Sequence, residues 1–318
     1  MTNAPKAGIV VVGSLNADLT IYCDRLPQPG ETVHGDGFAV NPGGKSANQA
    51  VAASKLGGQV SLIGAVGNDP NGTMLLDSTA SAGVDVSRVQ RSDASTGVAV
   101  ISVDASGENS IIISAGANGT LRPSDVDVAA FADAAVVCLC LEVGIDTVIA
   151  AAQAGHYAGA AVLLNLSPYA EVPEVLAGLS DVLLVNAHEA SLFLGSEADI
   201  PDADAEAEAW EPVRSQFADR GLRRVLVTLG SQGSVVLDSQ ARGAEDQITR
   251  IPPTRVNAVD TTGAGDAFTG AVAARLAAGD SLAAAAAFAS VAAALAATKK
   301  GTQAAYASRE EVEAALTS

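Results

Sequence analysis

The stretch Val136-Val-Cys-Leu-Cys-Leu141, with the helical pattern over 146–158 and the run Ala161-Val-Leu-Leu164, decides the fold class of this chain. The two apolar runs are short, as buried strands are, and the segment between them has the length of a helix. A strand, a helix and a second strand in this order form a β-α-β unit with parallel strands. The sequence therefore predicts a mainly parallel sheet at this point.

The same alternation of strand and helix extends from this unit toward both ends of the chain. Strands are predicted at 9–12, 60–65, 182–185 and 225–229, and helices at 47–56, 72–82 and 188–194, with three alanine-rich helices toward the C-terminus. Strands that take turns with helices imply a sheet with helices on both faces. The predicted fold class is α/β, a doubly wound and mainly parallel sheet flanked by helices.

Two regions, 17–42 and 96–115, interrupt this alternation. They hold short strand patterns joined by turns, with no helix between the strands. They predict a small separate sheet that covers a site as a lid. The alternative is an edge extension of the main sheet, which is weaker because both insertions interrupt the same fold. The expected domains are a core of 1–16, 43–95 and 116–318, and a β-sheet lid of 17–42 and 96–115.

The composition limits the classes of partner. The chain of 318 residues has a formal net charge of −18, which repels nucleic-acid backbones and anionic membranes, so neither is expected as a partner. The sequence has no apolar run of membrane-spanning length and no apolar signal core near its N-terminus. The three cysteines, at 23, 138 and 140, lack zinc-site spacing and suit a reducing compartment. A cytoplasmic location is expected.

The stretch Val259-Asp-Thr-Thr-Gly-Ala-Gly-Asp-Ala-Phe-Thr-Gly270 places an aspartate just after a glycine-rich turn that opens an apolar helix. Small residues let the backbone amides of 263–265 approach an anion, and the helix start adds partial positive charge. Phosphoryl transfer to a hydroxyl needs such amides to stabilise charge and a carboxylate, here Asp266, to take the hydroxyl proton. The alternative is an N-cap with glycines for chain reversal.

Polar residues also follow the first predicted strand and the middle one. Asn16 and Asp18 come after 9–12, and Glu142 comes after 136–141. In an open parallel sheet the ligand lies beyond the carboxyl ends of the strands, so these side chains are candidates for binding a substrate. A turn into the lid explains Asn16 and Asp18 equally well.

The segment Asn41-Pro-Gly-Gly-Lys-Ser-Ala-Asn-Gln-Ala50 contains the Gly-Lys-Ser of a phosphate-binding P-loop. Ala39 stands where that loop needs its first glycine, and Pro42 lies inside it, so we reject the P-loop. What remains is a Gly-Gly turn that opens a helix. Lys45 and Asn48 lie one turn apart at its start, where both are able to hydrogen-bond a polyol or a phosphate.

Two further segments are candidates for contact with a nucleotide. Asn186 and Glu189 lie one helical turn apart after 182–185, and they suit Mg²⁺ held directly or through water; an N-cap with an acidic first turn is the alternative. Thr228-Leu-Gly-Ser-Gln-Gly233 is a glycine-punctuated turn that alone indicates only a hairpin. The three histidines share no metal-type spacing. Ser14, Ser46 and Ser167 lack a plausible His/Asp relay, which disfavours nucleophilic hydrolysis.

Together these segments resemble the ribokinase-like (PfkB) family of carbohydrate kinases over nearly the whole chain. Any one segment is weak, but the ordered set is highly specific. The resemblance is carried by 13–18, 29–33, 43–52, 95–99, 107–109, 115–118, 186–189, 228–231, 260–266 and 300–301. It implies an α/β core, a β-sheet lid that commonly serves as a homodimer interface, and ATP-dependent phosphorylation of a sugar's primary hydroxyl.

The resemblance also implies a role for each matching residue. Asp266 is expected to be the base, with the amides of Gly263, Ala264 and Gly265 as the anion hole. The residues expected to hold the sugar are Asn16, Asp18, Gly43, Gly44, Lys45, Asn48 and Glu142. ATP and Mg²⁺ are expected at Asn186, Glu189, Thr228, Gly230, Ser231, Gly233, Gly265 and Ser290. A monovalent cation, usually K⁺, is expected to order the anion hole from a loop with Asp260, Thr262, Ala296 and Gly301.

The chain departs from the family pattern without losing a catalytic group. The departures are Ser46 in the Gly-Gly-Lys-Gly turn, Val185 and Ala187 around the Asn-x-x-Glu, Leu166 and Ser167 in a segment often written Asn-Pro-x-Pro, and Ser290 beside the adenine site. Ser46 is expected to tighten the sugar pocket, and Val185 and Ala187 to alter the outer shell of Mg²⁺.

The expected substrate is D-ribose, phosphorylated at its 5-hydroxyl, with deoxyribose, fructose or a nucleoside as alternatives. A nucleoside is less favoured because the predicted lid offers only Tyr22 and Phe38 as aromatic surface for a base. A non-catalytic sugar-sensing protein is weaker, since the base and the glycine turn are present. A dinucleotide-binding oxidoreductase is weaker still, because no Gly-x-Gly-x-x-Gly follows the first strand.

Overall fold

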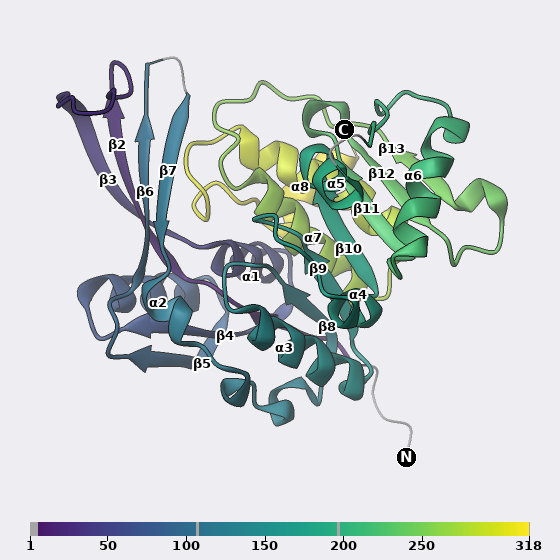
Figure 1. The fold of residues 1–318 in the computed structure, drawn as a ribbon, viewed down its shortest axis with the longest axis horizontal. Coiled ribbons are helices and arrows are strands. Elements are labelled where there is room, and N and C mark those ends of the chain that lie inside the picture. Colours follow the sequence, from purple (N-terminus) through teal and green to yellow (C-terminus); the bar gives the residue numbers. More distant parts are fainter. Residues whose placement is uncertain (1–5, 106–107, 196–197, 318) are drawn as a thin grey trace.

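The computed structural model describes residues 6–105, 108–195 and 198–317. Residues 1–5, 196–197 and 318 of the predicted core and residues 106–107 of the predicted lid lie outside the described residues. The described chain forms two sheets, a large one within the helical body and a small one that extends from it (Figure 1).

The large sheet has nine strands in the order β13-β12-β11-β10-β9-β8-β1-β4-β5. Its parallel strands are β1 (Gly8–Val12), β4 (Gln59–Gly67), β5 (Asp85–Ser92), β8 (Ala134–Leu139), β9 (Ala161–Asn165), β10 (Val182–Asn186) and β11 (Arg224–Thr228). The chain runs from β1 to β4 and β5 on one side and then returns to β8 on the other. The carboxyl ends of β1 and β8 therefore flank the topological switch point, where open α/β sheets bind their ligands.

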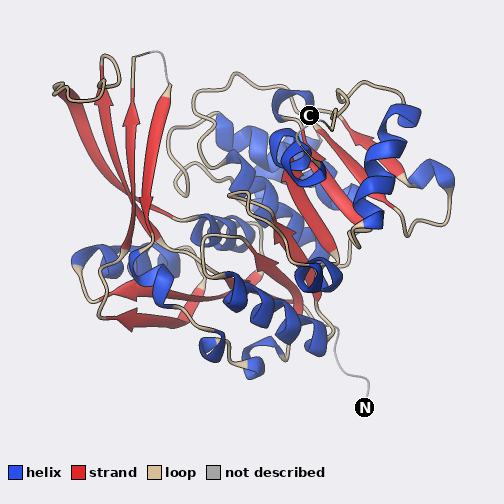
Figure 2. Cartoon of the chain, viewed as in Figure 1, coloured by secondary structure: helices blue, strands red, loops and turns tan. Residues whose placement is uncertain are grey.

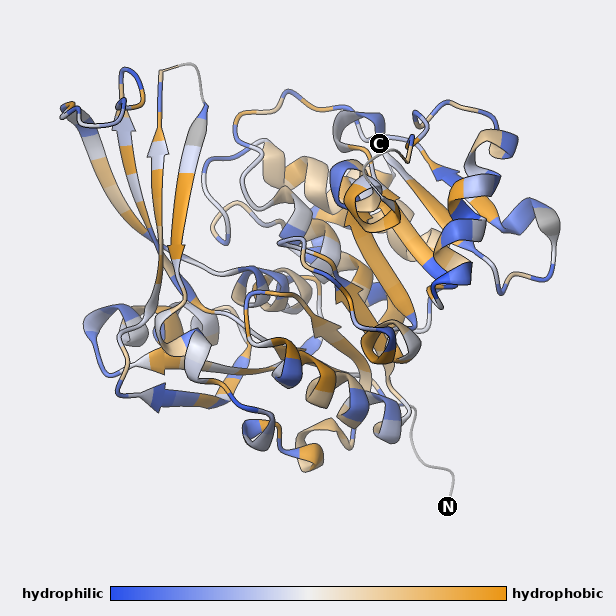
Figure 3. Cartoon of the chain, viewed as in Figure 1, coloured by the Kyte–Doolittle hydropathy of each residue, from blue (hydrophilic) through white to orange (hydrophobic). Residues whose placement is uncertain are grey.

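Helices cover both faces of this sheet (Figure 2). On one face lie α1 (Lys45–Lys55), α2 (Pro70–Ser81), α7 (Ala264–Ala277), α8 (Leu282–Ala297) and α9 (Arg309–Leu316), and on the other α3 (Ile145–Ala158), α4 (Glu174–Leu179), α5 (Ala187–Leu194) and α6 (Ala207–Asp219). In β1 the alternation of side chains sends Ile9 and Val11 into the first core and Val10 and Val12 into the second. Strands buried on both faces are apolar throughout, as the colouring of Figure 3 shows for the centre of the sheet.

The small sheet has the order β3-β2-β6-β7, built from β2 (Asn16–Cys23), β3 (Gly35–Gly43), β6 (Gly97–Val103) and β7 (Asn109–Ser114). Its register pairs Leu19 with Val40 and Val100, and Val100 with Ile112. These residues share one face, which we call the apolar face; it consists of Leu19, Ile21, Phe38, Val40, Val100 and Ile112. Asp18 is the neighbour of Leu19 on β2 and lies on the opposite face.

The predicted fold class is confirmed, including the smaller second sheet. The sequence patterns missed the edges of the large sheet. Strand β5 carries polar residues because it is an edge strand, and β12 (Ser234–Asp238) and β13 (Ile248–Ile251) add antiparallel strands after the turn that follows β11. Within the described ranges, no helix has both the length and the apolar character that crossing a bilayer requires.

Candidate active site

The polar residues predicted to bind a sugar meet at the switch point. Asn16 begins β2 only a few residues after β1 ends, and the register of the small sheet sets it between Gly43 and Gly97. Glu142 follows β8 and accepts hydrogen bonds from Ser14 Oγ at 2.5 Å and from the backbone amide of Lys45 at 3.1 Å. The ends of β1 and β8 and the start of α1 are thus joined through one carboxylate.

Asn16 is buried, and its side chain is oriented by a neighbouring amide. Asn118 Nδ2 donates to Asn16 Oδ1 at 2.8 Å and to the carbonyl of Leu15 at 3.0 Å. Because Asn118 occupies the oxygen of the Asn16 amide, Nδ2 of Asn16 points away from Asn118. The pair presents a fixed N–H donor at the base of the small sheet.

Asp18 lies among other acidic groups. Burial raises its pKa from 3.8 to about 7, and the charges of Glu142 and Asp266 add to that rise while Lys45 opposes it. The carboxyl group fits only because position 43 is glycine: a Cβ there would lie 2.1 Å from Asp18 Oδ2. Gly43 therefore leaves space for the carboxyl group of Asp18, although burial and the neighbouring carboxylates disfavour its charged form.

Asp266 lies in the first turn of α7 and is almost fully buried. Asn48 Nδ2 donates to its Oδ2 and Gln49 Nε2 to its Oδ1, both at 3.0 Å. Asn48 is a predicted sugar ligand, so the structure places the predicted base against the predicted sugar site. Two amide donors stabilise a carboxylate charge that burial would otherwise penalise.

The predicted anion hole has an open side and a closed side. Gly263 is the N-cap of α7 with a left-handed φ of 74°, and a Cβ on it would lie 2.8 Å from the hydroxyl of Tyr306. No atom lies within 4 Å of a Cβ built on Gly265, so an anion is able to approach the backbone there. The amide of Ala264 donates to the carbonyl of Thr261 at 3.1 Å, and an anion at this amide must share or replace that bond.

Lys45 is a partly buried cation that interacts with acidic groups from several parts of the predicted site. Burial opposes the charge of its ammonium group, but the carboxylates of Asp266, Glu142 and Glu189 together raise its pKa. One cation therefore lies within electrostatic range of the predicted base, a predicted sugar ligand and a predicted nucleotide-side residue. Ser46, beside it, is fully buried, and its hydroxyl lies 3.0 Å from Cys140 Sγ. That contact turns the Ser46 hydroxyl toward β8.

Asn186 and Glu189 form a capping box at the start of α5. The amide of Glu189 donates to Asn186 Oδ1 at 2.8 Å, and the amide of Asn186 donates to Glu189 Oε2 at 2.9 Å. The structure therefore shows the N-cap alternative, and Glu189 also lies within electrostatic range of Lys45. Carboxylate oxygen suits Mg²⁺, and the capping bond to Oε2 suits contact through water.

The other predicted nucleotide residues form a second group. Thr228 ends β11, and Gly230, Ser231 and Gly233 form the turn into β12. Ser231 lines an open hollow of about 530 Å³ together with Pro252 and Pro253. Ser290, on α8, lies beside the same segment, since its Oγ donates to the carbonyl of Pro252 at 3.3 Å. The structure thus brings Ser290 to the turn after β11.

Three of the four predicted monovalent-cation residues are joined by hydrogen bonds: Asp260, Thr262 and Gly301. Asp260 Oδ1 accepts from the amide of Thr262 and Oδ2 from the amide of Gly301, both at 2.9 Å. Burial works against the charge of Asp260, but these amides lower its pKa. Ala296 lies in the last turn of α8, and its carbonyl accepts from the backbone amide of Lys299. Asp260 therefore joins the loop before α7 to the loop after α8.

In the described part of the chain, no group of three or more His, Cys, Asp or Glu side chains is arranged to hold a metal ion. This finding concerns side-chain clusters of those four residue types in the described ranges and does not bear on a monovalent cation held by backbone carbonyls. The acidic groups near Lys45 are of the kind that contact Mg²⁺ singly, when phosphates and water supply the remaining ligands.

Comparison with known proteins identifies the family. Residues 6–309 match the family described as pfkB family carbohydrate kinase. The chain belongs to this family. A carbohydrate kinase of this family is a phosphotransferase that acts on a sugar, and the predicted family resemblance is confirmed.

Several pfkB-family relatives align over most of the chain. Deoxyribokinase of Salmonella typhi is 37% identical over 95% of this chain and 96% of the relative. Ribokinase of Schizosaccharomyces pombe is 37% identical over 83% of each. The structure of Arabidopsis thaliana ribokinase complexed with ribose and ATP superposes with a TM-score of 0.88 at 32% identity, over 98% of this chain and 99% of that one.

Three buried amides at the site were not singled out from the sequence as site residues. Gln49 and Gln303 belong to the contacts around Asp266, and Asn118 orients Asn16. Gln49 directly follows Asn48 in the Gly-Gly-Lys segment, and Asn118 lies within a segment that carries the family resemblance. The signal for Gln303 is weak, because it meets the site from a loop 255 residues away from Asn48 in sequence.

Proposed function

We propose that this kinase transfers the γ-phosphoryl group of ATP to the 5-hydroxyl of D-ribose and forms D-ribose 5-phosphate. The observation that carries the proposal is the position of Asp266: a buried carboxylate in the first turn of α7, bonded to Asn48 and within electrostatic range of Lys45 and Asp18. A carboxylate beside a helix start fits a base that receives a proton while the amides receive negative charge.

The chain's own residues divide the work. Asp266 takes the proton of the sugar hydroxyl, and the amides of 263–265 stabilise charge on the phosphoryl group. The sugar is held by Asn16, Asp18, Gly43, Gly44, Lys45, Asn48 and Glu142. Lys45 also neutralises part of the acidic charge that these carboxylates concentrate. In this arrangement hydroxyl donors meet carboxylate acceptors and the phosphoryl group meets N–H donors.

ATP, Mg²⁺ and K⁺ are the proposed cofactors. ATP would lie against Asn186, Thr228, Gly230, Ser231, Gly233, Gly265 and Ser290, and Glu189 would hold Mg²⁺ through water. Mg²⁺ supplies neutralisation of phosphate charge when bound. Asp260, Thr262, Ala296 and Gly301 would hold K⁺, and their contacts already connect the two loops that flank the start of α7.

Deoxyribose is the strongest alternative substrate, because a deoxyribokinase and a ribokinase are equally identical to this chain. We favour ribose because Asn118 fixes Asn16 as a buried N–H donor at the sugar site. A site that orients polar groups toward a hydroxyl discriminates against a sugar that lacks it, since its buried groups are then left unpaired. Fructose and nucleosides are the further candidates within the family.

The test is ADP release measured with ribose, deoxyribose, fructose and nucleosides, with and without K⁺. We expect the highest kcat/KM for ribose and stimulation by K⁺. A higher kcat/KM for deoxyribose would replace the substrate and keep the reaction. Absence of turnover on every sugar and nucleoside would contradict the kinase proposal.

A homodimer formed through the small sheet is also proposed, in a cytoplasmic setting. The apolar face leaves Phe38 65% and Ile112 71% exposed, on a sheet whose opposite face carries Asp18. Such an exposed apolar surface suits a second copy of the same chain. We propose that the sheet is at once a dimer interface and a lid over the sugar.

A further inference from the structure

Two glutamines with no role in the proposed reaction lie around the base. Gln49 is completely buried, and Gln303 is 5% exposed. Gln49 contacts Asp266 directly, and Gln303 Nε2 donates to Asn48 Oδ1 at 3.0 Å, while Asn48 itself donates to Asp266. Each oxygen of the Asp266 carboxylate thus accepts from one set of amide groups. We call these sets two arms: Gln49 on Oδ1, and Asn48 with Gln303 behind it on Oδ2.

The arm through Gln49 ends on a thiol. Cys138, on β8, donates from Sγ to Gln49 Oε1 at 3.3 Å. Burial raises the pKa of this thiol well above its ordinary value, so it keeps its proton and remains a donor. With its oxygen engaged by the thiol, the Gln49 amide must turn its N–H₂ toward Asp266.

A close helix contact sets the distance in this arm. Gly270 lies one turn after Asp266 on α7, and a Cβ on it would lie 2.5 Å from the carbonyl oxygen of Gln49 and 2.6 Å from Ala52 Cβ. The absence of a side chain at Gly270 therefore lets α7 approach the backbone of α1 at Gln49. The same approach brings the Gln49 amide within 3.0 Å of Asp266.

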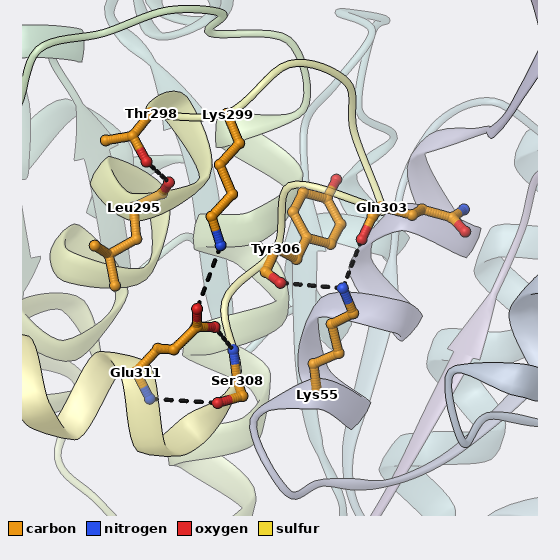
Figure 4. Close-up of polar contacts among 8 residues, drawn as sticks. All are labelled: Lys55, Leu295, Thr298, Lys299, Gln303, Tyr306, Ser308 and Glu311. Atoms are coloured by element: carbon orange, nitrogen blue, oxygen red, sulfur yellow. Dashed lines mark hydrogen bonds and ion pairs between the residues drawn. The ribbon is translucent and has the colours of Figure 1, made fainter.

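The arm through Gln303 is anchored by its backbone. Lys55 Nζ, at the end of α1, donates to the carbonyls of Gln303 at 2.8 Å and Tyr306 at 3.0 Å, and the Gln303 side chain extends away from that contact (Figure 4). Gln303 follows Gly301, whose amide is bonded to Asp260. The proposed cation loop and the base are therefore connected through Gln303 and Asn48.

We infer that Gln49 and Gln303 are positioning residues, which hold the Asp266 carboxylate in the orientation that accepts the sugar's proton, Gln49 directly and Gln303 through Asn48. This inference rests on the proposed function. The two arms differ in one respect: among the residues proposed to act on the substrate, Gln49 is bonded only to Asp266, whereas Gln303 acts through Asn48, which is also proposed to hold the sugar. Loss of Gln49 should therefore affect kcat, and loss of Gln303 should affect both kcat and KM.

The test compares Gln49→Met and Gln303→Met with the wild type in ADP release, together with ribose binding by calorimetry. Methionine keeps the approximate volume and removes the amide. We expect Gln49→Met to lower kcat about 10- to 100-fold with ribose affinity within about threefold, since misplacing a catalytic group by about 1 Å has an effect of this size. Gln303→Met should lower kcat and raise KM for the sugar.

Gly270→Ala and Gly178→Ala form a matched pair for the helix contact. Alanine at 270 forces α7 from α1 and should lower kcat as Gln49→Met does. A Cβ at Gly178, in α4, meets no atom within 4 Å, so that variant should keep wild-type kinetics. Equal kinetics in both variants would contradict the role of the helix contact.

Cys138 keeps the inference testable if Gln49→Met fails to fold. Cys138→Ala removes the donor to Gln49 and should lower kcat about threefold or more, while Cys138→Ser restores a donor and should recover most of it. A folded Gln49→Met enzyme with wild-type kcat, or equal kcat in the two Cys138 variants, would overturn the inference and leave the proposed function intact. A wild type that phosphorylates no sugar would overturn both, because Asp266 would then have no proton to take.

Discussion

At the scale of single residues, the site concentrates acidic side chains that influence one another. Asp18, Glu142 and Asp266 lie close enough for the last two to raise the pKa of Asp18, and Lys45 is the cation among them. Sugar hydroxyls are neutral donors, so a carboxylate-rich site suits them better than it suits an anionic ligand. In the proposed reaction the backbone amides at the start of α7 bind the phosphoryl group.

Asp18 makes stability depend on pH. Its pKa is about 7 in the folded protein and 3.8 ordinarily, so the folded state holds a proton that the unfolded state releases. This contribution is fully present below pH 4 and is lost as the pH rises toward 7. Between these values we expect the free energy of unfolding of the wild type to fall by on the order of 2 kcal/mol relative to Asp18→Asn, discounted for partial solvent contact.

Urea denaturation of both proteins between pH 4 and pH 8 measures the difference. Parallel pH profiles for the wild type and Asp18→Asn would show that Asp18 titrates normally and would contradict the effect of its burial.

Gly43→Ala tests the fit of the Asp18 carboxyl group. The new methyl group would lie 2.1 Å from Asp18 Oδ2, so the carboxylate must move. We expect KM for the sugar to rise about tenfold or more, with KM for ATP nearly unchanged, because Gly43 is one of the proposed sugar-binding residues. A KM for ATP that rises as much as KM for the sugar would indicate general distortion instead.

At the scale of elements, helix starts and the loops between helices carry the site. The starts of α1, α5 and α7 supply Lys45, Glu189 and Asp266. The loop between α8 and α9 supplies Gly301 and Gln303, which lie outside any strand or helix. Polar contacts with α1 at Gln303 and with Asp260 at Gly301 hold the loop, and further contacts hold its ends.

The start of α9 provides one of these ends. Ser308 Oγ accepts from the amide of Glu311 at 3.3 Å, Glu311 Oε2 accepts from the amide of Ser308 at 2.7 Å, and Lys299 Nζ reaches Glu311 at 3.3 Å (Figure 4). Ser308→Ala should lower the free energy of unfolding by about 1 kcal/mol, and Ser308→Thr should lower it much less. Chemical denaturation measures both, and an equal loss in both would contradict the capping role.

The sequence predicted most strands and helices because the spacing of apolar residues within each element shows which of its faces is buried. Residues 136–141 have the pattern of a buried strand, which predicts Glu142 at the carboxyl edge of the sheet. In the structure β8 ends at Leu139, and Glu142 follows it closely. The carboxyl ends of parallel strands lie at one edge, so the sequence predicts Asn16 and Glu142 at the same edge. That β1 and β8 are neighbours in the sheet is shown by the structure.

Gln49 could not be placed in the same way. Its contact with Asp266 spans 217 residues and depends on how closely α7 approaches α1, which no local pattern encodes.

At the scale of the whole molecule, the small sheet has two different faces. The face with Asp18 adjoins the proposed sugar site and leaves Ile111 and Ile113 about half exposed. The apolar face leaves Phe38 and Ile112 more exposed still. A second copy packed on the apolar face would hold the sheet over the site while covering Phe38 and Ile112. In this proposal the small sheet both closes over the sugar and joins the two chains.

Ile112→Glu should separate the proposed homodimer into monomers, because it buries a charge in an apolar interface. Val128→Glu is the matched control, since Val128 is similarly exposed, at 61%, and lies outside the small sheet. Light scattering coupled to size-exclusion chromatography should give twice the chain mass for the wild type and Val128→Glu, and the chain mass for Ile112→Glu. A monomeric wild type at micromolar concentration would contradict the interface.

Asp266→Asn tests most directly whether Asp266 is the base of a sugar kinase. The measurement is the rate of ATP-dependent phosphorylation of D-ribose by this variant and by the wild type, with ribose binding followed on the same samples. The variant's new amide nitrogen faces one of the donors on Asn48 and Gln49, so we expect ribose affinity to fall severalfold, by about fivefold. Turnover should fall by roughly 10²- to 10⁴-fold. Near-normal turnover by the variant would contradict the account.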